Sequence, residues 1–108
     1  EIRQAGELGF CGLYSPEAHG GLGLSRLDAA IVLEELAAAC PSTAAFISIH
    51  NMATWMVTTY GGDRLVEEWG ERLTRGEALA SYCLTEPGSG SDAASLRTTA
   101  RAGPPTCS

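Results

Sequence analysis

The sequence predicts a mainly α-helical domain that leads into one β-strand and a glycine-rich loop. Three observations support this fold class. Apolar residues recur at helical spacing from residue 25 to residue 76, between capping residues and glycines. From Ala78 to Thr85 the spacing changes to an alternation of period two. A run rich in glycine and serine follows at once, and 108 residues suffice for one ordinary domain.

The first part of the chain is predicted to be a short helix and a loop. Residues 1–9 have the pattern of the end of a helix whose start is missing, closed by Gly9 and Gly12. The stretch Tyr14–Gly23 contains a proline and several glycines, which are typical of turns with positive φ.

The first complete helix is predicted to begin after Ser25. Asp28 stands three residues further on, so the two can form a capping box. Glu34 and Glu35 face away from an apolar stripe made of Leu27, Ala30, Ile31, Leu36 and Ala37. The helix should end near Cys40, because the residue before a proline disfavours helical backbone.

Two further helices are predicted before the strand. Ser42 or Thr43 is expected to cap the first, whose apolar residues cover most of its circumference up to Gly61. Asp63 is expected to cap the second, which should break near Gly70 and stop at Gly76. The helices are expected to share one core, formed by Leu27, Ile31, Leu36, Phe46, Ile49, Trp55, Trp69 and Leu73.

Charge and composition argue against several classes of partner. The net charge of −6 is unfavourable for nucleic acid and for an anionic membrane surface. No apolar run approaches the roughly 20 residues of a membrane span. Neither His19 nor His50 has a second ligand nearby, so no metal site is predicted. Reduced thiols are expected at the four widely spaced cysteines, Cys11, Cys40, Cys83 and Cys107.

The most informative segment is Ser81–Asp92, with the sequence Ser-Tyr-Cys-Leu-Thr-Glu-Pro-Gly-Ser-Gly-Ser-Asp. The hydroxyl of Thr85 and the carboxylate of Glu86 stand where the predicted strand meets the glycine-rich turn. Small residues there let backbone N–H groups approach an electron-rich ligand with no side chain in the way. Spacing alone leaves a second interpretation open, a plain turn with a helix cap at Ser91.

Residues Cys83–Ser95 resemble a pattern of the acyl-CoA dehydrogenases: Cys-Leu-Thr-Glu, two residues, Ser-Gly-Ser-Asp, two residues, Ser. The loop Tyr14–Ser25 resembles the family's Pro-Glu-x-x-Gly-Gly-x-Gly segment, and Ile31–Leu36 resembles its core helix. The resemblance extends to about Ala100. Within the family it is strongest to the members that oxidise isobutyryl-CoA, as indicated by Ser42–Met52 and Tyr82–Leu96.

The resemblance implies a division of the chain. Residues 1–77 would be the helical N-terminal domain of the acyl-CoA dehydrogenase fold, and residues 78–100 would begin its β-domain with the flavin-binding segment. Residues 101–108 are expected to be a tail that departs from the family, since Pro104 and Pro105 cannot pair inside a sheet. The chain is therefore expected to be an N-terminal and middle fragment, without the helical C-terminal bundle.

The activity that the resemblance implies is FAD-dependent oxidation of a short branched-chain acyl-CoA, such as isobutyryl-CoA in valine breakdown, to the 2,3-enoyl-CoA. Electrons would pass to electron-transfer flavoprotein, and the whole enzyme would be a homotetramer. It would act in the mitochondrial matrix, although this chain shows no transit segment. Three alternatives remain open: a truncated non-catalytic product, another short- or branched-chain member, and an unrelated helical interaction module.

The resemblance also implies roles for individual residues. Thr85 would hydrogen-bond the pyrimidine side of the flavin ring, and Leu84 would pack against the ring. Ser91 would reach the FAD diphosphate or the pantetheine arm of the substrate. The complete set of expected cofactor contacts is Tyr82, Cys83, Leu84, Thr85, Glu86, Pro87, Gly88, Ser89, Gly90 and Ser91.

No catalytic residue is expected in this chain, because the family's base lies in the C-terminal bundle and Glu86 does not correspond to it. A helix face formed by Ile49, Met52 and Ala53 has two interpretations. It either packs in the core or contacts the short acyl chain, as the corresponding helix does in relatives.

Overall fold

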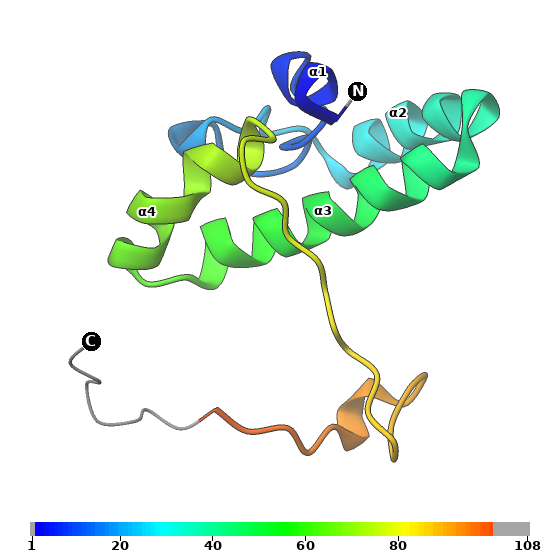
Figure 1. The fold of residues 1–108 in the computed structure, drawn as a ribbon, viewed down its shortest axis with the longest axis vertical. Coiled ribbons are helices and arrows are strands. Elements are labelled where there is room, and N and C mark those ends of the chain that lie inside the picture. Colours follow the sequence, from blue (N-terminus) through cyan, green and yellow to red (C-terminus); the bar gives the residue numbers. More distant parts are fainter. Residues whose placement is uncertain (1, 101–108) are drawn as a thin grey trace.

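The computed structural model describes residues 2–100 and confirms a mainly α-helical chain (Figure 1). The tail predicted over 101–108 lies outside the described residues. In chain order the elements are α1 (Ile2–Glu7), η1 (Glu17–His19), α2 (Arg26–Ala39), α3 (Pro41–Tyr60), α4 (Asp63–Thr74) and η2 (Ala93–Ser95), where η marks a 3₁₀ turn. Helices α2 and α3 lie side by side, and α4 folds back against α3.

The capping box predicted at the start of α2 is confirmed. Asp28 N–H donates to Ser25 Oγ at 3.2 Å, and Ser25 N–H donates to Asp28 Oδ2 at 3.2 Å. These bonds satisfy backbone donors that have no partner inside the helix. The helix ends at Ala39, and Cys40 has extended backbone before Pro41, as expected.

The predicted caps of α3 and α4 are wrong by one to three residues. Helix α3 begins at Pro41 rather than after Ser42 or Thr43. Proline suits the first helical position because its missing N–H would have no partner there. Helix α4 has Gly62 as its N-cap, and Asp63 is its first helical residue without a side-chain cap bond.

Helix α4 also continues through Gly70, where a break was predicted. A glycine inside a helix costs only about 1 kcal/mol relative to alanine, so packing can outweigh it. The predicted stop at Gly76 is confirmed. Gly76 has φ 67°, its N–H donates to the Leu73 carbonyl at 3.0 Å, and Glu77 N–H donates to the Arg72 carbonyl at 2.9 Å. These two bonds form a Schellman motif, which needs a residue with positive φ.

The predicted shared core is largely wrong. Leu27 and Ile31 of α2 are 72% and 54% exposed, and Phe46 and Ile49 of α3 are 42% and 41% exposed. Among the eight side chains expected in the core, only Leu73 is fully buried. The buried face of α3 instead carries small and polar residues: Ala44, Ile47, His50, Asn51, Ala53, Thr54 and Thr58.

Asn51 explains why a polar residue occupies this buried face. Its Oδ1 accepts the Leu13 N–H at 2.7 Å, and its Nδ2 donates to the carbonyls of Phe10 at 2.6 Å and Ile47 at 2.9 Å. The side chain has no exposed surface. Asn51 therefore fixes the loop after α1 to the middle of α3 through bonds shielded from water.

A stacked arginine fixes the start of α2 to α3. The Arg26 guanidinium lies 3.8 Å from the centroid of the Tyr14 ring and 4.4 Å from that of Trp55. Such cation–π contacts orient the three side chains relative to one another. Burial raises the pKa of the Tyr14 phenol, and the neighbouring Arg26 charge opposes that rise.

The strand predicted over Ala78–Thr85 is not formed, and no β-strand occurs among residues 2–100. The segment runs away from the helices without a neighbouring strand to pair with (Figure 1). The predicted alternation of period two is still visible in which residues of the segment are buried. The even positions 80, 82 and 84 are half-buried, whereas the odd positions from 79 to 85 are exposed. The radius of gyration of 15.4 Å exceeds the roughly 13 Å of a compact chain of this length.

Replacing Asn51 with alanine should destabilise the 108-residue chain by about 2–4 kcal/mol. The change leaves the buried Leu13 N–H and the part-buried Phe10 carbonyl without their partner, and each buried unsatisfied group costs about 1–3 kcal/mol. Urea unfolding followed by circular dichroism measures the change. Thr59→Ala, at an exposed position of the same helix, is the control and should shift stability by less than about 0.5 kcal/mol. Equal stabilities of both variants would contradict this role of Asn51.

Candidate functional site

A tight turn forms the centre of the predicted cofactor segment. Glu86 N–H donates to the Ser89 carbonyl at 2.8 Å, and Ser89 N–H donates to the Glu86 carbonyl at 3.1 Å. Pro87 and Gly88 occupy the two positions between them, where proline favours the backbone of the turn. The turn is therefore closed by two hydrogen bonds between its own ends.

The Glu86 carboxylate closes a larger loop around this turn. Its Oε2 accepts the Arg97 N–H at 2.9 Å, and its Oε1 accepts the Thr98 N–H at 2.7 Å. Bonds from the Thr98 side chain, then from the backbone N–H groups of Arg97 and Thr98, lower the pKa of the Glu86 carboxyl. Both carboxylate oxygens are engaged, so Glu86 holds the backbone of the loop.

A second set of bonds fixes the middle of the loop. Ser89 Oγ donates to the Asp92 carbonyl at 2.5 Å, and Ser95 Oγ donates to Asp92 Oδ2 at 2.5 Å. Asp92 thus links the turn to η2. Ser89 is only 6% exposed, so its hydroxyl faces the inside of the loop rather than its surface.

Several polar groups of this segment have no partner within residues 2–100. They are the Thr85 hydroxyl, the Ser91 hydroxyl and the backbone N–H groups of Gly88, Gly90 and Ser91. A Cβ placed on Gly88 would meet no atom within 4 Å, and one on Gly90 would meet only Thr85 Cγ2, at 4.0 Å. The segment therefore presents donors on an open backbone, which fits a ligand rich in acceptors such as a flavin nucleotide with its diphosphate.

The other predicted site residues flank these groups. Tyr82 and Leu84 are half-buried on one side of the extended segment, and Cys83 is exposed on the other. Glu86, Pro87 and Gly88 line a shallow hollow of about 350 Å³. The sequence analysis missed two residues that line the same hollow, Ser95 and Arg97. Arg97 is placed there by its bond to Glu86, eleven residues away in sequence, for which no local pattern exists, whereas Ser95 is held by Asp92, three residues before it.

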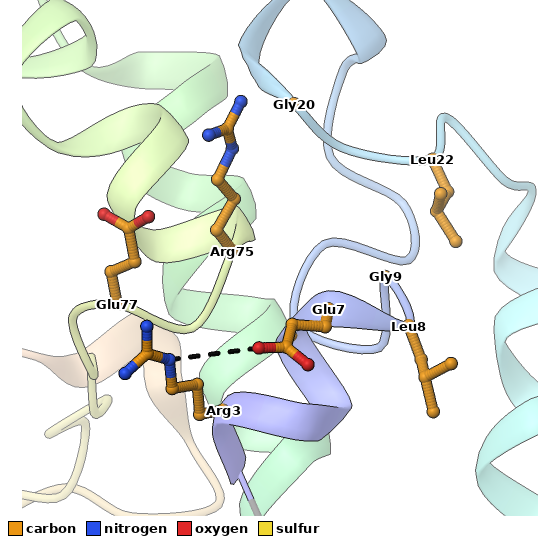
Figure 2. Close-up of a pocket in the computed structure, with 9 residues that line it drawn as sticks. Arg3, Glu7, Leu8, Gly9, Gly20, Leu22, Arg75 and Glu77 are labelled. Atoms are coloured by element: carbon orange, nitrogen blue, oxygen red, sulfur yellow. Dashed lines mark ion pairs between the residues drawn. The ribbon is translucent and has the colours of Figure 1, made fainter.

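A larger hollow, of about 540 Å³, lies elsewhere (Figure 2). Its walls come from α1, from the loop at Gly20 and Leu22 and from the residues after α4. Arg3 pairs with Glu7 at 3.9 Å, and Arg75 pairs with Glu71 at 3.0 Å. None of the predicted cofactor contacts lines this hollow, and both of its arginines are already paired with glutamates on the surface, so it offers no comparable ligand site.

The described residues include no group of three or more His, Cys, Asp or Glu side chains placed to hold a metal ion. They also include no helix long and apolar enough to cross a membrane.

Comparison with known proteins relates this geometry to a family. Residues 1–77 match the domain described as acyl-CoA dehydrogenase, N-terminal domain. The chain belongs to the acyl-CoA dehydrogenase family. The helical body around α2, α3 and α4 is thus this family's N-terminal domain, as the resemblance implied.

Individual acyl-CoA dehydrogenases match beyond that domain. The chain is 56% identical over 99 residues to the mitochondrial isobutyryl-CoA dehydrogenase of Dictyostelium discoideum and 52% identical to that of Bos taurus. It is 35% identical over 102 residues to the mitochondrial short-chain specific acyl-CoA dehydrogenase of Mus musculus. These matches cover 92–94% of this chain but only 24–25% of the relatives, so the chain spans about a quarter of their length.

A solved structure agrees with this assignment. The crystal structure of an acyl-CoA dehydrogenase from Bacillus anthracis, complexed with FAD, superposes with a TM-score of 0.64 at 35% identity. The match covers 88% of this chain and 16% of that one. The fold described above is therefore found in a member of the family that binds a flavin.

Loss of the Glu86 charge should open the loop between the turn and Thr98. The folded pKa of Glu86 lies below its ordinary value, so the closure is present at neutral pH and is lost as the pH falls through that lowered pKa. The amide shifts of Arg97 and Thr98, followed by NMR during acid titration, should move with the Glu86 carboxyl signal. In Glu86→Gln the two amides should no longer titrate, while Glu77→Gln is the control. If the amide shifts of Arg97 and Thr98 did not change as the Glu86 carboxyl titrates, the closure of the loop by Glu86 would be disproved.

Proposed function

We propose that this chain carries the helical N-terminal domain and one side of the FAD site of an acyl-CoA dehydrogenase. Residues 78–100 begin the β-domain in this proposal. The observation that carries it is the open run of unpaired donors from Thr85 to Ser91, next to a helical domain of this family. The similarity to a family member complexed with FAD supports the identity of the cofactor.

The residues would hold FAD through complementary groups. The Thr85 hydroxyl and the N–H groups of Gly88, Gly90 and Ser91 would donate to the flavin and its diphosphate, and Leu84 would contact the ring. FAD supplies the hydride acceptor for oxidation between Cα and Cβ of the acyl chain. Donors fixed beside a ring that gains negative charge on reduction stabilise the reduced form.

The substrate that we propose is a short branched-chain acyl-CoA of the isobutyryl-CoA type. Identities of 52–56% to isobutyryl-CoA dehydrogenases, against 35% to a short-chain specific enzyme, support it. On α3, Ile49 is 41% exposed and Met52 is half-buried, so both have surface left for an acyl chain, whereas Ala53 is 7% exposed. The mitochondrial names of the relatives support a place in the mitochondrial matrix. Electron-transfer flavoprotein as the acceptor and a homotetramer as the assembly are proposed from the family resemblance alone.

Substrate class can be tested in a chimaera. In it the matched segment of the Bos taurus isobutyryl-CoA dehydrogenase is replaced by residues 1–100 of this chain. We expect it to bind FAD and to favour isobutyryl-CoA over butyryl-CoA in kcat/KM. A preference for the straight chain would favour the alternative of a short-chain dehydrogenase.

The 108-residue chain alone should show no dehydrogenase activity with any acyl-CoA and an artificial electron acceptor. In our proposal it holds part of the cofactor site and no general base, and a missing base lowers the rate by about 10²–10⁴-fold. The chimaera is the positive control under the same assay. Turnover by the purified chain would refute this part of the proposal.

Thr85→Val in the chimaera should weaken FAD binding or lower the flavin potential. Valine keeps the shape of threonine and removes one hydrogen bond to a group that becomes charged, worth about 1–2 kcal/mol. Flavin content after dialysis and redox titration measure the two effects. Thr99→Val removes a hydroxyl at an exposed position outside the proposed contacts and serves as the matched control. Unchanged flavin content and potential in Thr85→Val would mean that Thr85 does not contact the ring.

A further inference from the structure

His50 lies on the buried face of α3 and joins three segments. Its side chain is 1% exposed. Its Nε2 lies 2.9 Å from the Leu73 carbonyl oxygen in the last turn of α4, and its Nδ1 lies 3.2 Å from the backbone nitrogen of Ala80. The sequence suggested no role for this residue.

The two partners determine the protonation of the ring. A carbonyl oxygen only accepts and a backbone N–H only donates, so Nε2 carries the proton and Nδ1 is the acceptor. Thr54 Oγ1, at 3.3 Å from Nε2, is a weaker second acceptor for the same N–H. Both ring nitrogens are engaged, and the neutral tautomer is the one that satisfies them.

The bond to Ala80 is the last hydrogen bond that links the described part of the chain after α4 to the helices. Before it, the N–H groups of Glu77 and Ala78 both donate to the Arg72 carbonyl, at 2.9 and 3.0 Å. After it, the hydrogen bonds of residues 81–100 are internal to that segment, as at Glu86 and Asp92. The segment leaves the helical body from this point (Figure 1).

We propose that His50 is a positioning residue for the cofactor segment. By holding Ala80 it fixes where the chain leaves the helical domain, two residues before Tyr82 and five before Thr85. It acts through the backbone and does not touch the cofactor. The flavin part of this inference rests on the proposed function, whereas the link between His50 and Ala80 does not.

Two substitutions separate the two bonds of the ring. In His50→Gln the amide Nε2 can take the place of the ring Nε2, so the bond to Leu73 is kept and the acceptor for Ala80 is lost. In His50→Asn the amide Oδ1 takes the place of Nδ1, so the bond to Ala80 is kept and the donor to Leu73 is lost. Ala80→Pro removes the donating N–H itself and leaves the ring intact. His19→Asn, at the other histidine of the chain, is the control.

Hydrogen exchange of the 108-residue chain, resolved by NMR, tests the link. The Ala80 amide should exchange roughly tenfold faster in His50→Gln than in the wild type, and within about twofold of the wild type in His50→Asn and His19→Asn. The Leu13 amide reports whether each variant keeps its fold.

Nitrogen-15 spectra of the wild-type ring should show protonated Nε2 and unprotonated Nδ1. Where His50→Gln fails to fold, Ala80→Pro replaces it, and residues 82–85 should then show increased mobility by ¹⁵N relaxation. Any of three results would overturn the link. The Ala80 amide could exchange at the same rate in His50→Gln and His50→Asn, or the wild-type ring could carry its proton on Nδ1. The third is that residues 82–85 of Ala80→Pro are no more mobile than those of the wild type.

The chimaera tests the consequence for the cofactor. We expect the FAD dissociation constant to rise roughly three- to tenfold in His50→Gln and in Ala80→Pro, and to stay near the wild-type value in His50→Asn. Equal FAD affinity in all variants of a chimaera that binds FAD would overturn the positioning role and leave the proposed function intact. If the unsubstituted chimaera fails to bind FAD, the proposed function fails, and the link is still decided by hydrogen exchange.

Discussion

The polar residues buried on one side of α3 are the constraint on which the rest of this structure depends. Asn51 hydrogen-bonds the Leu13 N–H and the Phe10 carbonyl of the loop after α1. His50 hydrogen-bonds the Leu73 carbonyl at the end of α4 and the Ala80 N–H after it. Both side chains are shielded from water, so leaving either set of partners unpaired would be costly. One helix therefore determines the positions of the segments on both sides of it, and a shift of α3 by one residue would break several bonds at once.

This arrangement explains why large apolar side chains remain outside. The interior side of α3 is taken by small and polar residues, of which His50 and Asn51 hydrogen-bond to other segments. Phe46 and Ile49 lie on its other side. Leu27 and Ile31 are likewise exposed on α2, where Ala29 is the buried residue. Hydrogen bonds and small residues thus contribute to the packing on the buried face of α3.

The sequence was sufficient where the deciding interaction is local. Ser25 and Asp28 form a cap within one turn, and Gly76 ends α4 by its own backbone geometry. It was insufficient where the partner is distant. Helical spacing in α2 has apolar residues on two sides, and only contact with α3 decides which side is buried. Glu86 and its partners are eleven and twelve residues apart, and the roles of His50 and Asn51 depend on loops that reach them from 23 to 41 residues away. The strand predicted over Ala78–Thr85 does not form for the same reason, since a strand requires a neighbouring strand with which to pair.

The segment from Ala80 to Thr98 combines the two kinds of interaction. Its entry is held by the distant His50, but the loop itself is closed by bonds among Glu86, Ser89 and Asp92 and the backbone that follows. Because those bonds span at most twelve residues, the loop can form before any sheet or cofactor is present. The unpaired donors of Thr85, Gly88, Gly90 and Ser91 then already lie on exposed residues, and a ligand that binds them has less conformational entropy to remove. In this proposal the extended stretch between Ala80 and Glu86 is the part that a neighbouring strand still has to order. Its start is held by the buried imidazole of His50, and its end is held by the loop that the Glu86 carboxylate closes.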